Sequence, residues 1–281
     1  MQRANERYRR DEIPPRVGPF KALQEFSREF GVTISFSSEL AERIFGWFKE
    51  RSTPEAHQIG NLFTGSFFFD AFFWPVSVPI GYGNFQLNPL EALDAMPQPV
   101  KTDLCRHRYD LQVYMLYWAD CVDYGYGMDD IRKLKPLSPL AMTFLANADR
   151  ELRAAVTQVV TPRPNYKASM AARMATEIFL KAFLIAKCDF GEEDVKEFRH
   201  DIARLAKRCQ QVTPLDEFKI IFDSAKLFPD VSTRYTGAEQ KLRDIWNAIS
   251  LGQVCAAAVV RQFSDRDIRS QLIQACSGDA A

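Results

Sequence analysis

The chain has 281 residues, of which 47% are hydrophobic and 26% are charged, a composition typical of a folded globular protein. This excludes a chain that is disordered or of low complexity throughout. Lysine plus arginine and aspartate plus glutamate both number 36, so any nucleic-acid site is expected to be a local basic patch. No apolar run follows the charged amino terminus, which predicts a cytoplasmic protein without a secretory signal.

Residues 1–136 are predicted to form a mostly helical but irregular, aromatic-rich region of unknown type. Gly31 is well suited to end a helix, and proline, glycine and asparagine crowd residues 74–99, which indicates loops there. The elements expected in this region are helices over 20–30, 38–51 and 104–122 and a short strand over 32–36.

The most apolar stretch of the chain covers residues 62–80. Asp70 and two prolines interrupt it before the ~20 apolar residues that a membrane span needs, so no span is predicted. Core packing, a partner-binding surface and a contact with a membrane surface all stay open as interpretations. Residues 66–74 contain five phenylalanines and a tryptophan, which predicts a symmetric homodimer unless the rest of the chain covers these rings.

Caps mark the helix boundaries of residues 137–281. Serine and then proline at 138–139, and threonine and then proline at 213–214, are each an N-cap followed by a favoured first residue. Asp189 and Glu192 have the spacing of a capping box. The five helices expected are 138–160, 166–188, 189–209, 213–227 and 236–263. Their short connections predict an up-and-down antiparallel bundle and a domain boundary between residues 136 and 137.

Three short sequence motifs occur together in the second half of the chain. They are residues 177–182 (EIFLKA), 200–205 (HDIARL) and 232–235 (STRY). In this order they give residues 138–263 a resemblance to the HEPN superfamily of helical bundles. The resemblance implies a module that binds a nucleotide, RNA or a partner protein, pairs as a homodimer, and acts in a toxin–antitoxin or defence setting.

Many members of that superfamily are metal-independent ribonucleases, in which an arginine is followed four to six residues later by a histidine on a late helix. This chain departs from the pattern, because residues 194–196 include no arginine and no histidine follows His200. Arg51 and His57 have the required spacing but lie outside the resembling region. The resemblance therefore favours a binding module without catalysis of its own.

Two alternatives stay open beside this reading. One is a divergent metal-independent ribonuclease that uses His200 with Arg199 or Arg204, assisted by Glu177. The other is a structural protein–protein interaction module that docks through the aromatic residues 63–85. Cysteine, histidine, aspartate and glutamate nowhere have the spacing of a metal site, so neither a metal nor another cofactor is expected.

A polar stripe crosses the otherwise apolar helix predicted over 166–188, because Arg173, Glu177 and Lys181 follow one another at intervals of four. Such a stripe is either a surface ladder of ion pairs or the lining of a groove that holds a phosphate or a base edge. His200 is expected to point away from the apolar seam of its helix, unless that helix begins close to it. The binding candidates are Arg173, Glu177, Lys181, His200, Asp201, Arg204, Arg234 and Tyr235, of which His200, Arg204 and Glu177 are also weak candidates for catalysis.

Overall fold

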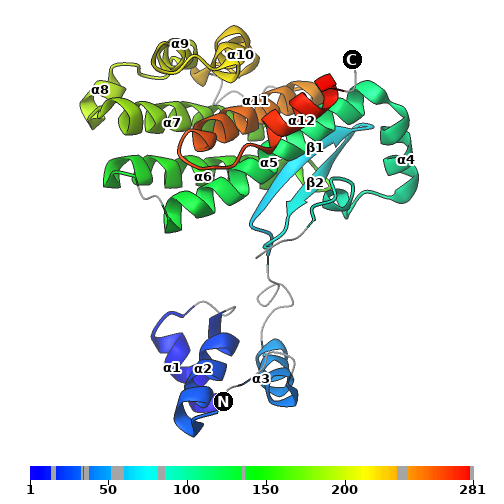
Figure 1. Cartoon of the computed structure of the whole chain (residues 1–281), viewed down its shortest axis with the longest axis vertical. Coiled ribbons are helices and arrows are strands. Elements are labelled where there is room, and N and C mark those ends of the chain that lie inside the picture. Colours follow the sequence, from blue (N-terminus) through cyan, green and yellow to red (C-terminus); the bar gives the residue numbers. More distant parts are fainter. Residues whose placement is uncertain are drawn as a thin grey trace. The chain divides into compact units, whose positions relative to one another are not determined.

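The computed structural model describes residues 1–13, 17–32, 34, 38–51, 60–81, 86–134, 137–232 and 240–278. The chain divides into two compact units, Met1–Gly60 (unit 1) and Asn61–Ala281 (unit 2). Helices make up most of both units, and the described residues contain a single sheet of two strands (Figure 1). The prediction of a mainly α protein is therefore confirmed.

The described residues of unit 1 form three helices. Its core consists of six buried side chains, with Tyr8, Leu23 and Phe48 among the largest. The helix ending at residue 30 is followed by Gly31 with a φ of 64°, as the sequence predicts, and the expected strand over 32–36 lies mostly outside the described residues. The helices are α1 (Gln2–Arg10), α2 (Gly18–Phe30) and α3 (Glu39–Lys49).

Helix α1 was not expected from the sequence. Its nine residues, QRANERYRR, are polar almost all round, and only Tyr8 is buried. A stripe of apolar residues is the signal from which an amphipathic helix is recognised, and α1 offers a single position of such a stripe. Tyr8 donates a hydrogen bond to Glu25 of α2 at 2.7 Å, so tertiary contacts stabilise this helix.

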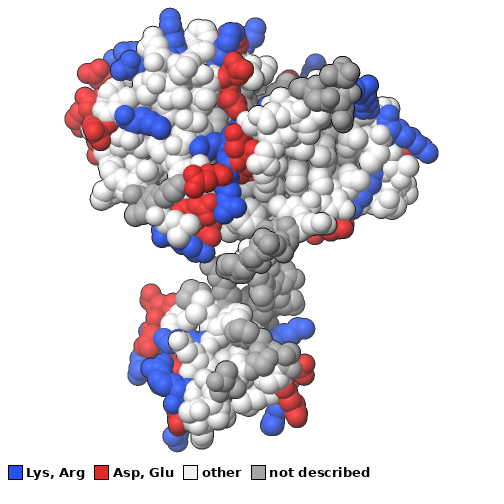
Figure 2. Space-filling model, viewed as in Figure 1, with Lys and Arg blue, Asp and Glu red and all other residues white. Residues whose placement is uncertain are grey.

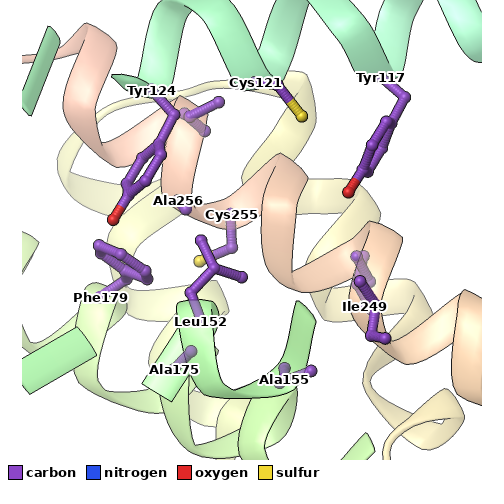
Figure 3. Packing of buried hydrophobic residues seen from close by; sticks show 14 of the residues in the cluster. Tyr117, Cys121, Tyr124, Leu152, Ala155, Ala175, Phe179, Ile249, Cys255 and Ala256 are labelled. Carbon is purple, nitrogen blue, oxygen red and sulfur yellow. The ribbon is translucent and has the colours of Figure 1, made fainter. Parts of the chain in front are cut away.

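The core of unit 2 lies between four long helices. Helix α7 packs against α6 and α11, and α11 also packs against α5. Figure 3 shows this core, in which Tyr124 of α5 and Phe179 of α7 point toward each other with ring centroids 5.8 Å apart. The four helices are α5 (Arg108–Lys133), α6 (Pro139–Val159), α7 (Ala168–Cys188) and α11 (Leu242–Arg261).

Shorter helices surround this core. The capping predicted from the sequence is present at Ser138, whose hydroxyl accepts a hydrogen bond from the amide of Ala141 at 3.3 Å. The remaining elements of unit 2 are η3 (Glu91–Leu93), α4 (Gln98–Arg106), α8 (Glu192–Lys196), α9 (Ile202–Val212), α10 (Asp216–Ser224), η4 (Ala225–Leu227) and α12 (Ile268–Gly278). The caps predicted at Asp189 and Thr213 are wrong, because these residues follow the ends of α7 and α9. The single helix expected over 189–209 is two helices, α8 and α9, separated by a turn.

The aromatic segment forms a β-hairpin, which the sequence analysis did not anticipate. Strand β1 (Phe63–Phe69) pairs antiparallel with β2 (Phe72–Val78), so residues 74–78, expected as loop, are a strand. The turn residues Asp70 and Ala71 have φ values of 50° and 62°, as a two-residue hairpin turn requires. The usual signals were weak, because Asp-Ala replaces the favoured Asp-Gly and apolar residues do not alternate along β1.

The hairpin contributes to the core of unit 2 rather than standing apart from it. The ring of Phe67 lies 5.0 Å from that of Tyr114 in α5 and 5.4 Å from that of Trp246 in α11. The boundary between the two compact units falls between Gly60 and Asn61, whereas the boundary predicted from the sequence lies between residues 136 and 137. The latter position lies between α5 and α6, whose side chains share one core.

The same packing bears on the reason for expecting a homodimer. Phe67 and Phe73 are buried within the chain, and Phe68, Phe69 and Trp74 pack partly against the core. Phe72 is the exception, with 62% of its surface exposed. The chain itself therefore covers most of the aromatic rings from which the homodimer was predicted. The homodimer stays a prediction.

Candidate functional site

The polar stripe on α7 faces the loop that connects α8 to α9. Helix α9 begins at Ile202 and is capped by Asp201, whose side chain accepts a hydrogen bond from the amide of Arg204 at 2.9 Å. Arg199 just before it has a φ of 49°, a left-handed conformation that is uncommon for a residue with a side chain. His200 therefore lies in a sharply turned loop, and the alternative in which its helix starts nearby describes the structure.

Glu177 and His200 are in direct contact. Nδ1 of His200 lies 3.1 Å from Oε2 and 3.2 Å from Oε1 of Glu177. The Glu177 side chain is largely buried, and the His200 side chain is 64% exposed. Because the carboxylate fixes the Nδ1 edge of the ring, the opposite edge with Nε2 is the one available to a ligand.

The two basic residues of the stripe hold the loop in place. Arg173 donates a hydrogen bond to the carbonyl of His200 at 2.7 Å, and Lys181 donates to the carbonyl of Arg199 at 2.9 Å. Lys181 also contacts Oε1 of Glu177 at 2.7 Å. We call Arg173, Glu177, Lys181 and His200 the α7 cluster. These four binding candidates are brought together, and they fix the strained turn onto α7.

A small hollow of about 110 Å³ opens beside the α7 cluster. The hollow is smaller than most sites for whole ligands, so it suits one chemical group. Among the described residues, the buried Nε of Arg173 has no hydrogen-bond partner. Burial lowers the pKa of this guanidinium, against the attraction of Glu177, Asp230 and Asp201. The hollow is lined by Met170, Arg173, Met174, Glu177, Ile178, His200 and Val231.

Asp201 and Arg204 are not among the described residues that line this hollow. Asp201 is used as the cap of α9, and Arg204 lies 4.9 Å over the ring of Phe198 while donating to the carbonyl of Glu197 at 3.1 Å. Arg204 is exposed all the same, as are Arg199 and Lys207, so this end of α9 carries positive charge. Arg234 and Tyr235 fall outside the described residues, as does His57.

A second group of charges was not found from the sequence. Asp120 and Asp123 of α5 both contact Arg261 of α11, at 2.9 and 3.0 Å, and Arg261 reaches Glu217 of α10 at 3.0 Å. Arg269 of α12 completes the group with a contact to Asp120 at 2.6 Å. We call these five residues the buried charge cluster. The only signal was a pair of aspartates within an apolar helix, which did not reveal partners so distant in the chain.

The buried charge cluster joins four helices. Asp123 accepts hydrogen bonds from the amides of Ile268 at 2.8 Å and Arg269 at 3.2 Å, so it caps the start of α12. Burial raises the pKa of Asp120 to about 6, and Arg269 and Arg261 oppose this increase. Every one of these carboxylates has partners inside the protein, which indicates a structural role.

Figure 2 shows one face of the protein, on which acidic and basic side chains are interspersed over much of the surface. Among the described residues, no three of His, Cys, Asp and Glu are grouped so as to hold a metal ion. None of the described helices combines the length and the apolar character that crossing a bilayer demands. No family model, curated protein or solved structure matches the chain, so its resemblance to the HEPN superfamily rests on the three motifs alone.

Proposed function

We propose that unit 2 is an HEPN-like binding module that holds a phosphate group of an RNA or a nucleotide beside the α7 cluster. The observation that carries this proposal is the guanidinium of Arg173, a residue that lines the hollow and whose buried Nε has no hydrogen-bond partner among the described residues. A buried donor without an acceptor costs about 1–3 kcal/mol, and an anionic oxygen that reaches this donor removes that cost. Planar guanidinium groups are well suited to binding phosphate.

The position of His200 supports the same assignment. Its exposed ring lies at the rim of the hollow, held by Glu177, so that the ring presents its Nε2 edge to an incoming ligand. Arg199, Arg204 and Lys207 are exposed on the adjoining loop and helix. They supply local positive charge for attracting RNA, and the carboxylates of Glu197 and Asp201 are exposed on the same segment.

The test is binding of a labelled single-stranded RNA, followed by fluorescence anisotropy, with ATP as a competitor. His200→Ala is expected to weaken binding about fivefold or more, because one donor to the phosphate is lost. His107→Ala is the matched control, since His107 is another exposed histidine of unit 2 outside the hollow. Equal affinity of the wild type and His200→Ala, or failure of the wild type to bind either probe, contradicts the proposal.

A divergent metal-independent ribonuclease is the second candidate, and the Glu177–His200 contact is what favours it. A carboxylate that orients a histidine is a common arrangement for general acid–base catalysis. Arg199 is the better cationic partner, because Arg204 already stacks on Phe198 and binds the carbonyl of Glu197. Cleavage of the labelled RNA in EDTA that is lost in His200→Ala identifies an enzyme, and binding without cleavage identifies a binding module.

A further inference from the structure

A larger cavity of about 260 Å³ lies elsewhere in unit 2, next to the hairpin. It is bounded by the end of β2, by the segment that contains η3, and by one side chain of α5. No residue of the α7 cluster or of the buried charge cluster contributes to it. The lining residues are Asn61, Ser77, Pro79, Gln86, Leu87, Asn88, Glu91, Ala92, Asp94 and Trp118.

The described lining of this cavity is acidic. Glu91 and Asp94 are its only charged residues, and lysine, arginine and histidine are absent from the described lining. Oε1 of Glu91 accepts a hydrogen bond from the side-chain amide of Asn88 at 3.1 Å, and Oδ1 of Asp94 accepts one from the amide of Ala95 at 2.8 Å. Neither carboxylate is paired with a cation among the described residues, so both keep acceptor positions for a ligand.

Trp118 gives the cavity a second, independent feature. The residue is only 6% exposed, and it packs in the core of unit 2 while also lining the cavity. Among the described residues, no acceptor receives a hydrogen bond from its indole N–H. A buried tryptophan normally satisfies this donor. Because Trp118 lines the cavity, its indole N–H is the donor that an oxygen atom of a bound molecule would use.

We propose that this cavity binds a small hydroxylated primary amine, of the amino alcohol or amino sugar class. The ammonium group would contact Glu91 and Asp94, and a hydroxyl oxygen would accept the indole N–H of Trp118. The amide nitrogen of Asn61 already donates to the hydroxyl of Ser77 at 2.9 Å, so the amide oxygen of Asn61, the hydroxyl hydrogen of Ser77 and the amide of Gln86 are the further partners for hydroxyl groups. The volume is just below the usual lower bound of about 300 Å³ for ligand sites, so the ligand is small.

The charge of the lining residues disfavours an anionic ligand in this cavity. At the α7 cluster, by contrast, basic side chains favour an anion. Two carboxylates face this cavity without a basic neighbour in the described lining, and a phosphate would be repelled. A neutral sugar would satisfy Trp118 and the amides but would leave the acidic charge without a counterpart. The proposal is independent of the function assigned to the α7 cluster, so each can fail alone.

The experiment is NMR titration of the whole ¹⁵N-labelled chain, read at the indole N–H signals of its four tryptophans. The probes are D-glucosamine and D-glucose, which differ in one amino group. Glucosamine is expected to shift the Trp118 signal in a saturable way and to leave that of Trp47, in unit 1, in place. Trp118→Phe assigns the signal by its disappearance.

The double substitution Glu91→Gln with Asp94→Asn tests the role of charge, and both positions are exposed, so folding should be preserved. It is expected to weaken glucosamine binding about tenfold or more. Asp103→Asn is the control, because Asp103 is an exposed carboxylate of α4 outside the cavity. Absence of a saturable shift, an equal response to glucose, or unchanged binding by the double variant would each overturn the proposal.

Discussion

The α7 cluster and the buried charge cluster contain the same kinds of side chain, but they differ in how completely these side chains are paired. In the buried charge cluster, Arg261 and Arg269 are surrounded by the carboxylates of three residues, and Arg261 is almost inaccessible to water. In the α7 cluster, the Glu177 carboxylate is buried but His200 is open to solvent, and one donor of Arg173 has no partner within the described ranges. The first arrangement is complete without a ligand, whereas the second has capacity to bind one.

The largest expected effect comes from removing the centre of the buried charge cluster. Arg261→Ala leaves Asp120, Asp123 and Glu217 facing one another without their shared cation, and should lower the free energy of unfolding by about 3–5 kcal/mol. Urea denaturation followed by circular dichroism measures this loss. Arg266→Ala is the control, because its pair with Asp130 is at the surface and should cost at most about 1 kcal/mol. Similar losses in the two variants would show that burial does not distinguish these pairs.

A smaller loss of stability is expected at the α7 cluster. Glu177→Gln removes the charge that faces both Lys181 and His200, while Lys181 keeps its bond to the carbonyl of Arg199. The free energy of unfolding should fall by about 1–2 kcal/mol, because one buried, charge-assisted contact is lost. RNA affinity should fall in the same variant, since His200 loses its orientation. A variant with normal stability and normal RNA binding would mean that Glu177 is a bystander.

The free energy of unfolding is expected to depend on pH because of the buried charge cluster. The pKa of Asp120 is about 6 in the folded protein against an ordinary value of 3.8, so the folded state takes up a proton that the unfolded state does not hold between these values. The contribution of Asp120 is therefore fully present below about pH 4 and is lost as pH rises through 6. Between pH 7 and pH 5 the free energy of unfolding should increase by about 1 kcal/mol from this group.

Asp120→Asn separates this effect from other titrations. Urea denaturation of the wild type and the variant at pH 7 and pH 5 should give a stability difference that depends on pH. Asp123 contributes in the same direction, because burial raises its pKa too. Parallel pH profiles of the two proteins would contradict the assignment of a raised pKa to Asp120.

The smallest effect on stability is expected at His200 itself. The side chain of His200 is largely exposed, so His200→Ala should change the free energy of unfolding by no more than about 0.5 kcal/mol. The same variant is expected to lose RNA affinity. A loss of binding without a loss of stability would distinguish the α7 cluster from the buried charge cluster. A loss of several kcal/mol would instead show that His200 is a structural residue like those of the buried charge cluster.

The sequence predicted those parts of the fold that depend on local signals. The serine–proline cap at the start of α6 and the apolar repeat of α7 placed both helices within about two residues of their observed bounds. The hairpin and α1 were missed because their stability comes from distant partners. Phe67 packs on Trp246, and Tyr8 donates a hydrogen bond to Glu25. Local sequence patterns do not predict such contacts.

The candidate site was predicted in its members but not in its geometry. Glu177 and His200 were named from short motifs, and their contact depends on where α9 begins, which the sequence left open within a turn of helix. Asp201 caps α9, so the helix begins after it and His200 lies in the preceding loop. The cavity beside Trp118 could not be anticipated, because its described lining comes from four separate parts of the chain: Asn61, residues 77–79, residues 86–94 and Trp118.

The position of the hairpin has a consequence for synthesis on the ribosome. The strands β1 and β2 emerge early, but α11, which covers Phe67, is made only after most of the chain has been translated. Until then the aromatic face of the hairpin is incompletely covered, and exposed apolar surface on a nascent strand promotes aggregation. We therefore expect folding of unit 2 to be completed only after its last long helix has left the ribosome.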